Sequence, residues 1–235
     1  MAIKDVLYSA LRASPIGPRL AHIYPYNFKP HQLCAILGLV SEVLEKHPTG
    51  EFVEVGCCQG YTSIFLSTHV ATAAPSGSYL YQGYDTFAGF EKDDIDFELV
   101  DRGLGLKRDL YSGFQRNRQD WVQQSVDRNR AWTIPIQLMK ANATTHDFAE
   151  VKQPIFILID VDVFKPTENA LHRLWPRLLP GGVVVLDDCS VGADGMPDLK
   201  DKFSGGHAAL LEFVKDKDIP IAYLADKLAV IRKPA

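Results

Sequence analysis

Hydrophobic residues in the second half of the chain follow two alternating patterns. Short, almost wholly apolar runs are typical of strands buried on both faces of a parallel sheet. Between them, apolar residues recur at helical spacing. The expected strands are 134–143, 154–160 and 181–188, and the expected helices are 167–179 and 205–217. Strands that alternate with helices predict a parallel sheet covered by helices on both faces.

The two ends of the chain add further elements to this α/β pattern. Residues 219–233 predict a terminal hairpin that turns at Asp226 and Lys227 and contributes an antiparallel strand. In the first half, the expected helices are 4–12, 30–47 and 61–69, and the expected strands are 51–55 and 76–85. We therefore expect one domain, 1–235, that opens with an N-terminal helical segment, 1–50.

Residues 88–130 interrupt this regular pattern. Their first part, 91–101, holds six acids and one lysine, whereas 102–130 holds seven basic residues and three acids. One interpretation is a solvated helical insert. The other is a lid over a pocket, because long inserts in compact domains often serve the function.

Composition narrows the class of partner. The chain has 235 residues, 46% of them hydrophobic and 23% charged, with a net charge of −4 and a pI of about 6.0. This balance predicts no general attraction to nucleic acid or to an anionic membrane. No run of residues is long and apolar enough for a membrane helix or a signal peptide.

The four cysteines indicate the cellular compartment of the protein, and the N-terminal segment suggests a contact between subunits. The cysteines are Cys34, Cys57, Cys58 and Cys189, and they show neither a disulfide pattern nor a metal-ligand spacing. We interpret them as reduced thiols of a cytoplasmic protein. The aromatic-rich N-terminal segment is a candidate contact in a homodimer.

Acidic residues stand where the expected strands end. They are Glu54, Asp85, Asp160 with Asp162 beside it, Asp187 and Asp188. The carboxyl ends of parallel strands lie at one edge of the sheet, where ligands bind, so several of these acids are expected to share one site. Clustered carboxylates repel one another unless a cation lies among them. Their hard oxygens favour Mg²⁺, or alternatively Mn²⁺ or Ca²⁺, over zinc.

The turn after strand 51–55 predicts a nucleoside site without a pyrophosphate. Gly56 and Gly60 are spaced G-x-x-x-G, which is neither the dinucleotide fingerprint nor a P-loop. Glycines let the backbone approach a ligand closely. Asp85, at the end of the second strand, is placed to accept hydrogen bonds from two ribose hydroxyls. S-adenosylmethionine is a nucleoside of this kind, and carboxylates favour its cationic sulfonium.

Four segments, taken in order, resemble the class I S-adenosylmethionine-dependent methyltransferases. They are "FVEVGCCQGYTS", "YQGYDTFAGF", "FILIDVDVFKPTENAL" and "LLPGGVVVLDD". The nearest likeness is to the macrocin O-methyltransferase family, whose members methylate sugar hydroxyls of natural products with Mg²⁺. The resemblance implies a Rossmann-like fold with a mostly parallel seven-stranded sheet, helices on both faces and a C-terminal antiparallel hairpin.

The resemblance also implies roles for individual residues. Around the methionine end of the cofactor it places Glu54, Gly56, Gly60, Tyr61 and Thr62. Around the ribose it places Asp85, Thr86 and Phe87, and near the adenine Asn142 and Ala143. The implied metal ligands are Asp160, Asp187 and Asp188, and Asp162 is expected to point into the fold.

These roles predict an O-methyltransferase that acts on a hydroxyl of a small molecule, with a natural-product sugar or a vicinal diol as the expected acceptor. A metal bound to the hydroxyl lowers its pKa and holds it in line with the methyl group. The candidate bases are His146, His207 and Asp160.

Two functions from other classes remain open at this point. "FILIDVDVF" also has the form of the D-x-D metal site of a nucleotide-sugar glycosyltransferase. Alternatively, the chain is a non-catalytic nucleoside-binding module, an interpretation favoured by the lack of an obvious base. Binding of UDP-sugar without S-adenosylmethionine would favour the glycosyltransferase, and absence of any methyl transfer would favour the module.

Overall fold

The computed structural model describes residue 10, residues 28–112, 114–115 and 117–234. Apart from residue 10, the expected helix at 4–12 lies outside the described residues, and so does most of the aromatic N-terminal segment.

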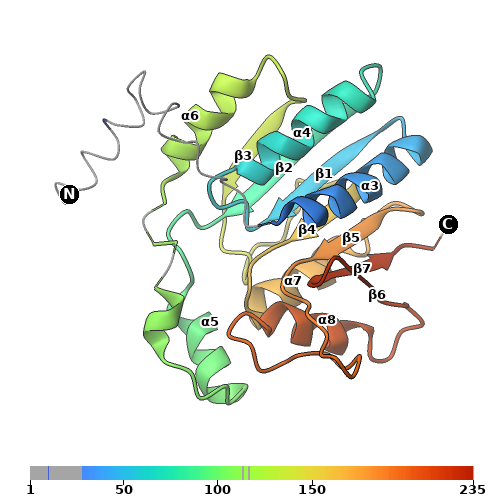
Figure 1. Cartoon of the computed structure of the whole chain (residues 1–235). Helices are drawn as coiled ribbons and strands as arrows, with labels where there is room; N and C mark the ends of the chain where they lie inside the picture. Colours follow the sequence, from blue (N-terminus) through green and yellow to red (C-terminus); the bar gives the residue numbers. More distant parts are fainter. Residues whose placement is uncertain (1–9, 11–27, 113, 116, 235) are drawn as a thin grey trace.

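A single seven-stranded sheet forms the centre of the protein (Figure 1). Its strands are β1 (Thr49–Val55), β2 (Ser78–Asp85), β3 (Ile136–Lys140), β4 (Pro154–Ile159), β5 (Val183–Leu186), β6 (Ala222–Leu224) and β7 (Leu228–Arg232). Their spatial order is β3-β2-β1-β4-β5-β7-β6. The first five strands are mutually parallel, whereas β7 pairs antiparallel with both β5 and β6. This arrangement confirms the predicted mostly parallel sheet with a C-terminal antiparallel hairpin.

Helices cover both faces of the sheet. They are α3 (Pro30–Lys46), α4 (Tyr61–Ala73), α5 (Lys92–Asp96), α6 (Gln119–Asn129), α7 (Phe164–Leu174) and α8 (Gly205–Val214). Proline is favoured at the first position of a helix, and Pro30 begins α3 there. The helix expected at 167–179 begins earlier and stops at Leu174, since Pro176 cannot continue it.

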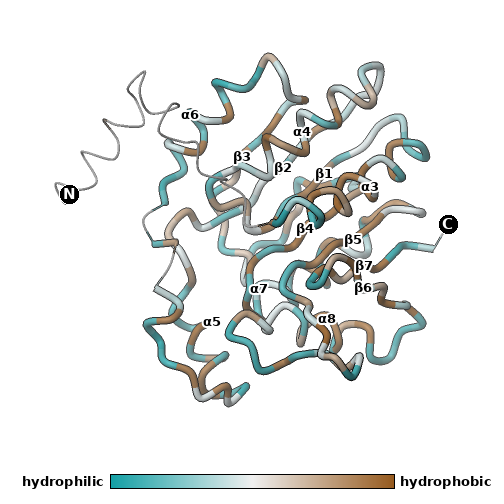
Figure 2. The backbone as a smooth tube through the Cα atoms, viewed as in Figure 1, coloured by the Kyte–Doolittle hydropathy of each residue, from teal (hydrophilic) through white to brown (hydrophobic). Residues whose placement is uncertain are grey.

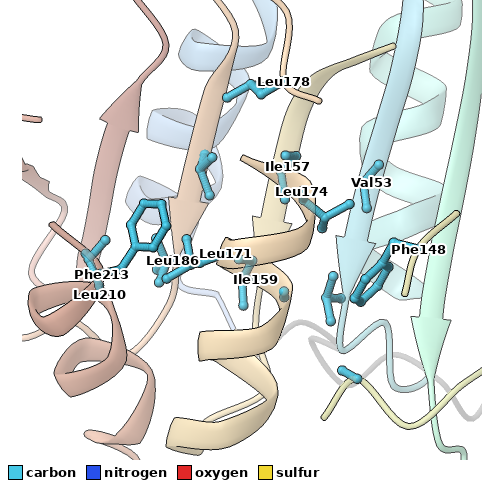
Figure 3. Packing of buried hydrophobic residues seen from close by; sticks show 14 of the residues in the cluster. Val53, Phe148, Ile157, Ile159, Leu171, Leu174, Leu178, Leu186, Leu210 and Phe213 are labelled. Atoms are coloured by element: carbon cyan, nitrogen blue, oxygen red, sulfur yellow. The ribbon is translucent and has the colours of Figure 1, made fainter. Parts of the chain in front are cut away.

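Alternate residues of each strand enter two hydrophobic layers. Phe52 of β1 packs with α3 and α4 in one layer, whereas its neighbour Val53 packs with α7 and α8 in the other. Figure 3 shows the second layer, in which Leu171 and Leu174 of α7 lie over the sheet. Figure 2 shows how hydrophobic residues concentrate along the central strands. Burial on both faces is the reason for the continuous apolar runs in the sequence.

The connection from β3 to β4 contains no helix. Residues 141–153 form a loop, and its side chains Phe148 and Val151 enter the second hydrophobic layer where a helix would otherwise lie. The edge-to-face pair of Phe148 and Tyr84, with ring centroids 4.9 Å apart, fixes this loop on β2.

The expected insert at 88–130 divides into two parts. Its end, α6, packs on β3 and buries Val122 and Val126, so it is the crossover helix between β2 and β3. Its beginning contains α5, a π-helical turn at Phe97–Asp101 and a 3₁₀ turn at Arg108–Tyr111. This first part stands beside α7, away from the strands (Figure 1).

The strand order places a crevice between β1 and β4. From β1 the chain continues to β2 and β3, which lie on one side of β1 in the sheet. It then returns to β4, which lies on the other side of β1, and continues from there to β5. The connections that follow β1 and β4 therefore lead in opposite directions. Ligands of open α/β sheets bind at such a switch point, beyond the carboxyl ends of the strands. Among the described helices, none has both the length and the apolar character needed to cross a bilayer.

Candidate active site

A hollow with an empty volume of about 730 Å³ lies at this crevice. Residues from four parts of the chain line it: the turn after β1, the end of β2, the loop after β3 and the end of β4. The segment between β2 and α6 adds an aromatic wall with Phe90 and Phe114.

Gly56 lets two strand ends approach each other at the bottom of the hollow. Its φ is +95°, and its N–H donates to the carbonyl of Tyr84 at 2.8 Å. A Cβ placed on this residue would lie 1.9 Å from the carbonyl oxygen of Asp160. The first glycine of the motif is therefore required by the packing of β1 against β4, and it also lines the hollow.

Gly60 and the residues after it serve mainly to begin α4. Gly60 is the N-cap, with a φ of +73°, and a Cβ there would lie 2.7 Å from Val122 of α6. Tyr61 and Thr62 form the first turn of the helix. These three residues are not among those that line the hollow, although the resemblance placed them around the cofactor.

Asp85 is fixed by backbone donors at the rim of the hollow. Its Oδ2 accepts the N–H of Cys58 at 2.8 Å, and its Oδ1 accepts the N–H of Phe87 at 2.6 Å. Burial raises the pKa of the Asp85 carboxyl, and the two N–H donors partly offset this effect. Each oxygen keeps a lone pair for a ligand in the hollow, which Asp85 lines.

The neighbours of Asp85 in the sequence face different directions. Thr86 lines the hollow, and its hydroxyl donates to the carbonyl of Gly89 at 2.7 Å, which closes the turn after β2. Phe87 instead is buried against Cys57 and Val122 on the other side of that turn. Phe87 therefore does not face the hollow, although the resemblance placed it beside the ribose.

Asn142 and Ala143, expected near the adenine, do line the hollow. The N–H of Ala141 donates to the carbonyl of Asp85 at 2.9 Å, so this loop is attached to β2. The side-chain oxygen of Asn142 accepts the N–H of Thr144 at 2.9 Å and stabilises the turn that follows β3.

Glu54 is buried on the opposite side of β1 and does not belong to the lining of the hollow. Its Oε2 accepts hydrogen bonds from the hydroxyls of Ser63 and Tyr81, the latter at 2.9 Å. Burial raises the pKa of Glu54 from 4.5 to about 7, although both hydroxyl donors act to lower it. Glu54 thus joins β1, β2 and α4 beneath the site.

This burial predicts that Glu54 makes the protein less stable as the pH rises. Between pH 4.5 and 7 the unfolded chain has released the proton while the folded chain retains it, so stability is lost across this interval. We expect the unfolding free energy of the wild type to fall by about 3 kcal/mol relative to that of Glu54→Gln. Urea denaturation across this pH range measures the difference.

The control for this experiment is Glu45→Gln, which removes a carboxylate at an exposed position of α3. Its stability should follow that of the wild type across the same interval. If the unfolding free energies of Glu54→Gln and the wild type changed in parallel with pH, Glu54 would not be the group responsible for the loss of stability.

The structure brings Asp160, Asp187 and Asp188 together beside the hollow. Each offers a carboxylate oxygen, and the three oxygens lie within 4.8 Å of one another. Burial and the neighbouring carboxylates raise the pKa of Asp160 well above its ordinary value, and they raise that of Asp187 to about 6. The acids at the ends of β4 and β5 therefore meet as the strand pattern predicted.

Asp162 also takes part in this cluster instead of pointing into the fold. It lines the hollow with a φ of +64°, and its carboxyl shares a hydrogen bond with Asp188. The acid cluster, as we use the term below, consists of Asp160, Asp162, Asp187 and Asp188.

Lys227 is a neighbour of the cluster that sequence reasoning treated only as part of a turn. Its Nζ lies 2.5 Å from Oδ2 of Asp187 and 3.0 Å from Oδ1 of Asp188. Burial lowers the pKa of Lys227, but attraction to these two acids outweighs it and raises the pKa overall. The pairing of β7 beside β5 was the missing signal, because it places the start of β7 next to the acids that follow β5.

The two candidate histidine bases lie outside the lining of the hollow. His146 packs on the ring of Tyr84, and its Nε2 lies 2.8 Å from Glu150. His207 is buried in α8, with its Nε2 2.9 Å from the hydroxyl of Tyr223. Of the three candidate bases, only Asp160 lines the hollow.

The acid cluster has the chemistry of a divalent-cation site. Oδ1 of Asp187 is buried and, within the described part of the chain, has no hydrogen-bond partner. A buried carboxylate oxygen without a partner is costly unless a cation binds it. Three converging carboxylates fit Mg²⁺, Mn²⁺ or Ca²⁺, which prefer oxygen ligands.

Residues 30–207 match the family described as Macrocin-O-methyltransferase (TylF). The chain belongs to this family. The match includes the glycine turn, Asp85 and the acid cluster, and it ends within α8.

A related sequence is the 8-demethyl-8-(2,3-dimethoxy-alpha-L-rhamnosyl)-tetracenomycin-C 4'-O-methyltransferase of Streptomyces olivaceus. It is 26% identical over 167 residues, which are 70% of this chain and 63% of that protein. The chain thus spans somewhat less than two thirds of the length of that relative.

Two solved structures show the same fold. The O-methyltransferase NovP superposes with a TM-score of 0.66 at 16% identity, over 87% of this chain and 80% of NovP. The calicheamicin methyltransferase CalS11 gives a TM-score of 0.66 at 17% identity, over 99% and 93%. The fold is therefore that of the class I methyltransferases, as the resemblance implied.

Proposed function

We propose that this protein is an S-adenosylmethionine-dependent O-methyltransferase that uses a divalent ion to methylate a sugar hydroxyl of a natural product. The observation that carries the proposal is the meeting of two kinds of site at one hollow. Asp85, with its carboxylate held by two backbone donors, lies on one side, and Asp160 of the acid cluster lies on the other. The family membership and the rhamnosyl acceptor in the name of the Streptomyces relative favour the sugar.

The cofactor is expected to lie across the ends of β1, β2 and β3. Asp85 accepts hydrogen bonds from the two ribose hydroxyls, and Asn142 with Ala143 lies against the adenine. Gly56 lets the ends of β1 and β4 come together beside the expected position of the methionine part, because a Cβ there would overlap the carbonyl oxygen of Asp160. The carboxylates around the hollow favour the positive charge of the sulfonium.

The divalent ion is expected to bind Asp160, Asp187 and Asp188, with Mg²⁺ as the first choice and Mn²⁺ or Ca²⁺ as alternatives. When bound, it lowers the pKa of the acceptor hydroxyl and fixes its orientation. The unpartnered Oδ1 of Asp187 supports this assignment. The three converging carboxylates support it as well, because these ions prefer oxygen ligands.

The protein's own residues then position the acceptor and remove a proton. Methyl transfer forms an oxygen–carbon bond as the sulfur–carbon bond breaks, and the reacting atoms must lie in line. Asp160 is the base that we assign, since it lines the hollow where His146 and His207 do not. Phe90 and Phe114 supply an apolar wall against which the sugar and the group it carries can pack.

We further propose that residues 88–112, 114–115 and 117–118 form this wall in a single-domain enzyme. This proposal keeps the lid interpretation for the first part of the expected insert. Two contacts attach the segment to the rest of the protein. Asn117 donates to the carbonyl of Cys58 at 2.5 Å, and Tyr111 donates to the carbonyl of Lys202 at 2.7 Å. The segment therefore joins the glycine turn to the loop before α8, across the hollow.

The proposal is tested with a rhamnosyl glycoside bearing free vicinal hydroxyls as the acceptor. We expect one methyl group to be added from S-adenosylmethionine in the presence of Mg²⁺, none in excess EDTA, and recovery when Mg²⁺ is restored. Mass spectrometry measures the product. S-adenosylhomocysteine should still bind in EDTA by calorimetry, because Asp85 and the loop after β3 bind it without the ion.

Each failure has a distinct meaning. Unchanged methylation in EDTA would contradict the role of the metal. Binding of UDP-sugar in place of S-adenosylhomocysteine would favour the D-x-D glycosyltransferase, which the family match already makes the weaker alternative. Cofactor binding without methyl transfer to any vicinal diol would favour a non-catalytic module.

A further inference from the structure

One cation lies within the acid cluster. Among the described residues, Lys227 is the cationic side chain that hydrogen-bonds to Asp187 and Asp188. Its charge also acts on the two acids that follow β4, Asp160 and Asp162. A single ammonium thus faces four carboxylates at the place where we propose a divalent ion.

The fold fixes Lys227 in this position. The N–H of Cys189, which directly follows the paired acids, donates to the carbonyl of Lys227 at 2.7 Å. The Lys227 ammonium lies 5.4 Å from the centre of the Phe28 ring, and its side chain is only 22% exposed. The ammonium therefore has little freedom to turn away from the acids.

The turn that carries Lys227 is also attached to the start of α3. Gln32 donates from its side chain to the carbonyl of Ala225 at 3.1 Å, and His31 lies 3.0 Å from the carboxylate of Asp226. Because both sides of the turn are held, the position of Lys227 is a property of the fold and not of a loose loop.

We propose that Lys227 is a built-in counter-cation that competes with the divalent ion for the oxygens of Asp187 and Asp188, and so keeps the ion weakly bound until the acceptor arrives. This inference rests on the proposed function, because it concerns the same metal site. Lys227 stabilises the clustered carboxylates while no ion is bound. It also repels an incoming ion, since both are positively charged.

The consequence is an order of binding. The ammonium already takes Oδ2 of Asp187 and Oδ1 of Asp188, so the ion finds fewer free protein oxygens than three carboxylates would otherwise offer. A vicinal diol supplies two further oxygens. We therefore expect the ion to be held firmly only together with an acceptor that chelates it, which favours diols over isolated hydroxyls.

The test measures metal binding to the full-length protein without acceptor. Free Mn²⁺ is followed by electron paramagnetic resonance during titration of the wild type, Lys227→Met and Lys227→Arg. We expect Lys227→Met to bind Mn²⁺ about tenfold more tightly than the wild type, because the repelling charge is lost. Lys227→Arg keeps the charge and should bind as weakly as the wild type.

The matched control is Lys217→Met. Lys217 also lies over an aromatic ring, that of Phe213, but it donates to a backbone carbonyl instead of to a carboxylate. Its replacement should leave the Mn²⁺ affinity unchanged. Thermal melting supplies a second measurement. Without metal, Lys227→Met should melt at a lower temperature than the wild type, and addition of Mn²⁺ should raise its melting temperature by more than that of the wild type.

Two results would overturn the inference in different ways. Equal or weaker Mn²⁺ binding by Lys227→Met, with measurable binding by the wild type, would show that Lys227 does not compete with the ion. Absence of Mn²⁺ binding by the wild type and all variants would contradict the metal site itself, and with it the metal dependence of the proposed function.

Discussion

Asp160→Asn is expected to lower kcat/KM for methyl transfer by about 10³-fold, the size of effect seen when one preorganised electrostatic group is removed from an active site. The change removes a charge from the acid cluster and the proposed base from the hollow. The affinity for S-adenosylhomocysteine should change only a few-fold, since Asp85 lies on the other side of the hollow. Steady-state kinetics and calorimetry measure the two quantities.

Asp147→Asn is the matched control for this variant. Together with His146 and Glu150, Asp147 forms another group of described residues with the spacing of a metal site, but that group is largely exposed. We expect its activity to equal that of the wild type. If Asp160→Asn retained activity within about tenfold of the wild type, its assignment as both ligand and base would be wrong.

Gly56→Ala is expected to abolish binding of S-adenosylhomocysteine and to destabilise the fold by more than the usual cost of a side chain at positive φ, which is about 1–2 kcal/mol. The added Cβ would lie 1.9 Å from the carbonyl oxygen of Asp160, so β1 and β4 must separate at their ends. That separation moves the bottom of the hollow. Calorimetry and thermal unfolding measure the two effects.

Gly103→Ala isolates the steric part of this effect. Gly103 has a φ of +65°, but no atom lies within 4 Å of the position of an added Cβ. This variant should bear only the conformational cost and should retain cofactor binding. Equal destabilisation of the two variants would mean that the close approach at Gly56 does not matter.

The sequence was sufficient to predict the sheet and the meeting of the acids. Runs such as 154–159 are apolar because both faces of β4 are covered, and parallel strands bring their carboxyl ends to one edge. The positions of Asp160, Asp187 and Asp188 follow from that rule. The boundaries of α7 were less exact, because the first helical residues precede the apolar periodicity.

The direction of individual side chains was harder to predict. Glu54 stands at the end of a strand like Asp160, but it shares the face of Phe52 and is therefore directed toward α4. Phe87 belongs to a conspicuous motif, and yet a φ of +51° turns it away from the hollow. A motif identifies which residues lie near a site, whereas backbone geometry decides which of them face the ligand.

Lys227 shows a different limit of sequence reasoning. Its contact with the acid cluster depends on the insertion of β7 between β5 and β6, a pairing between distant segments that no local pattern reveals. The aromatic wall was similarly unassigned, since Phe90 and Phe114 meet only through the irregular segment between β2 and α6.

The contact of Phe28 with Lys227 has a practical consequence for recombinant forms of the enzyme. The Phe28 ring is buried and lies 5.4 Å from the ammonium, so a shortened form that begins after residue 28 would lose the ring that covers this charge. Any shortened form used for metal titrations should therefore keep Phe28.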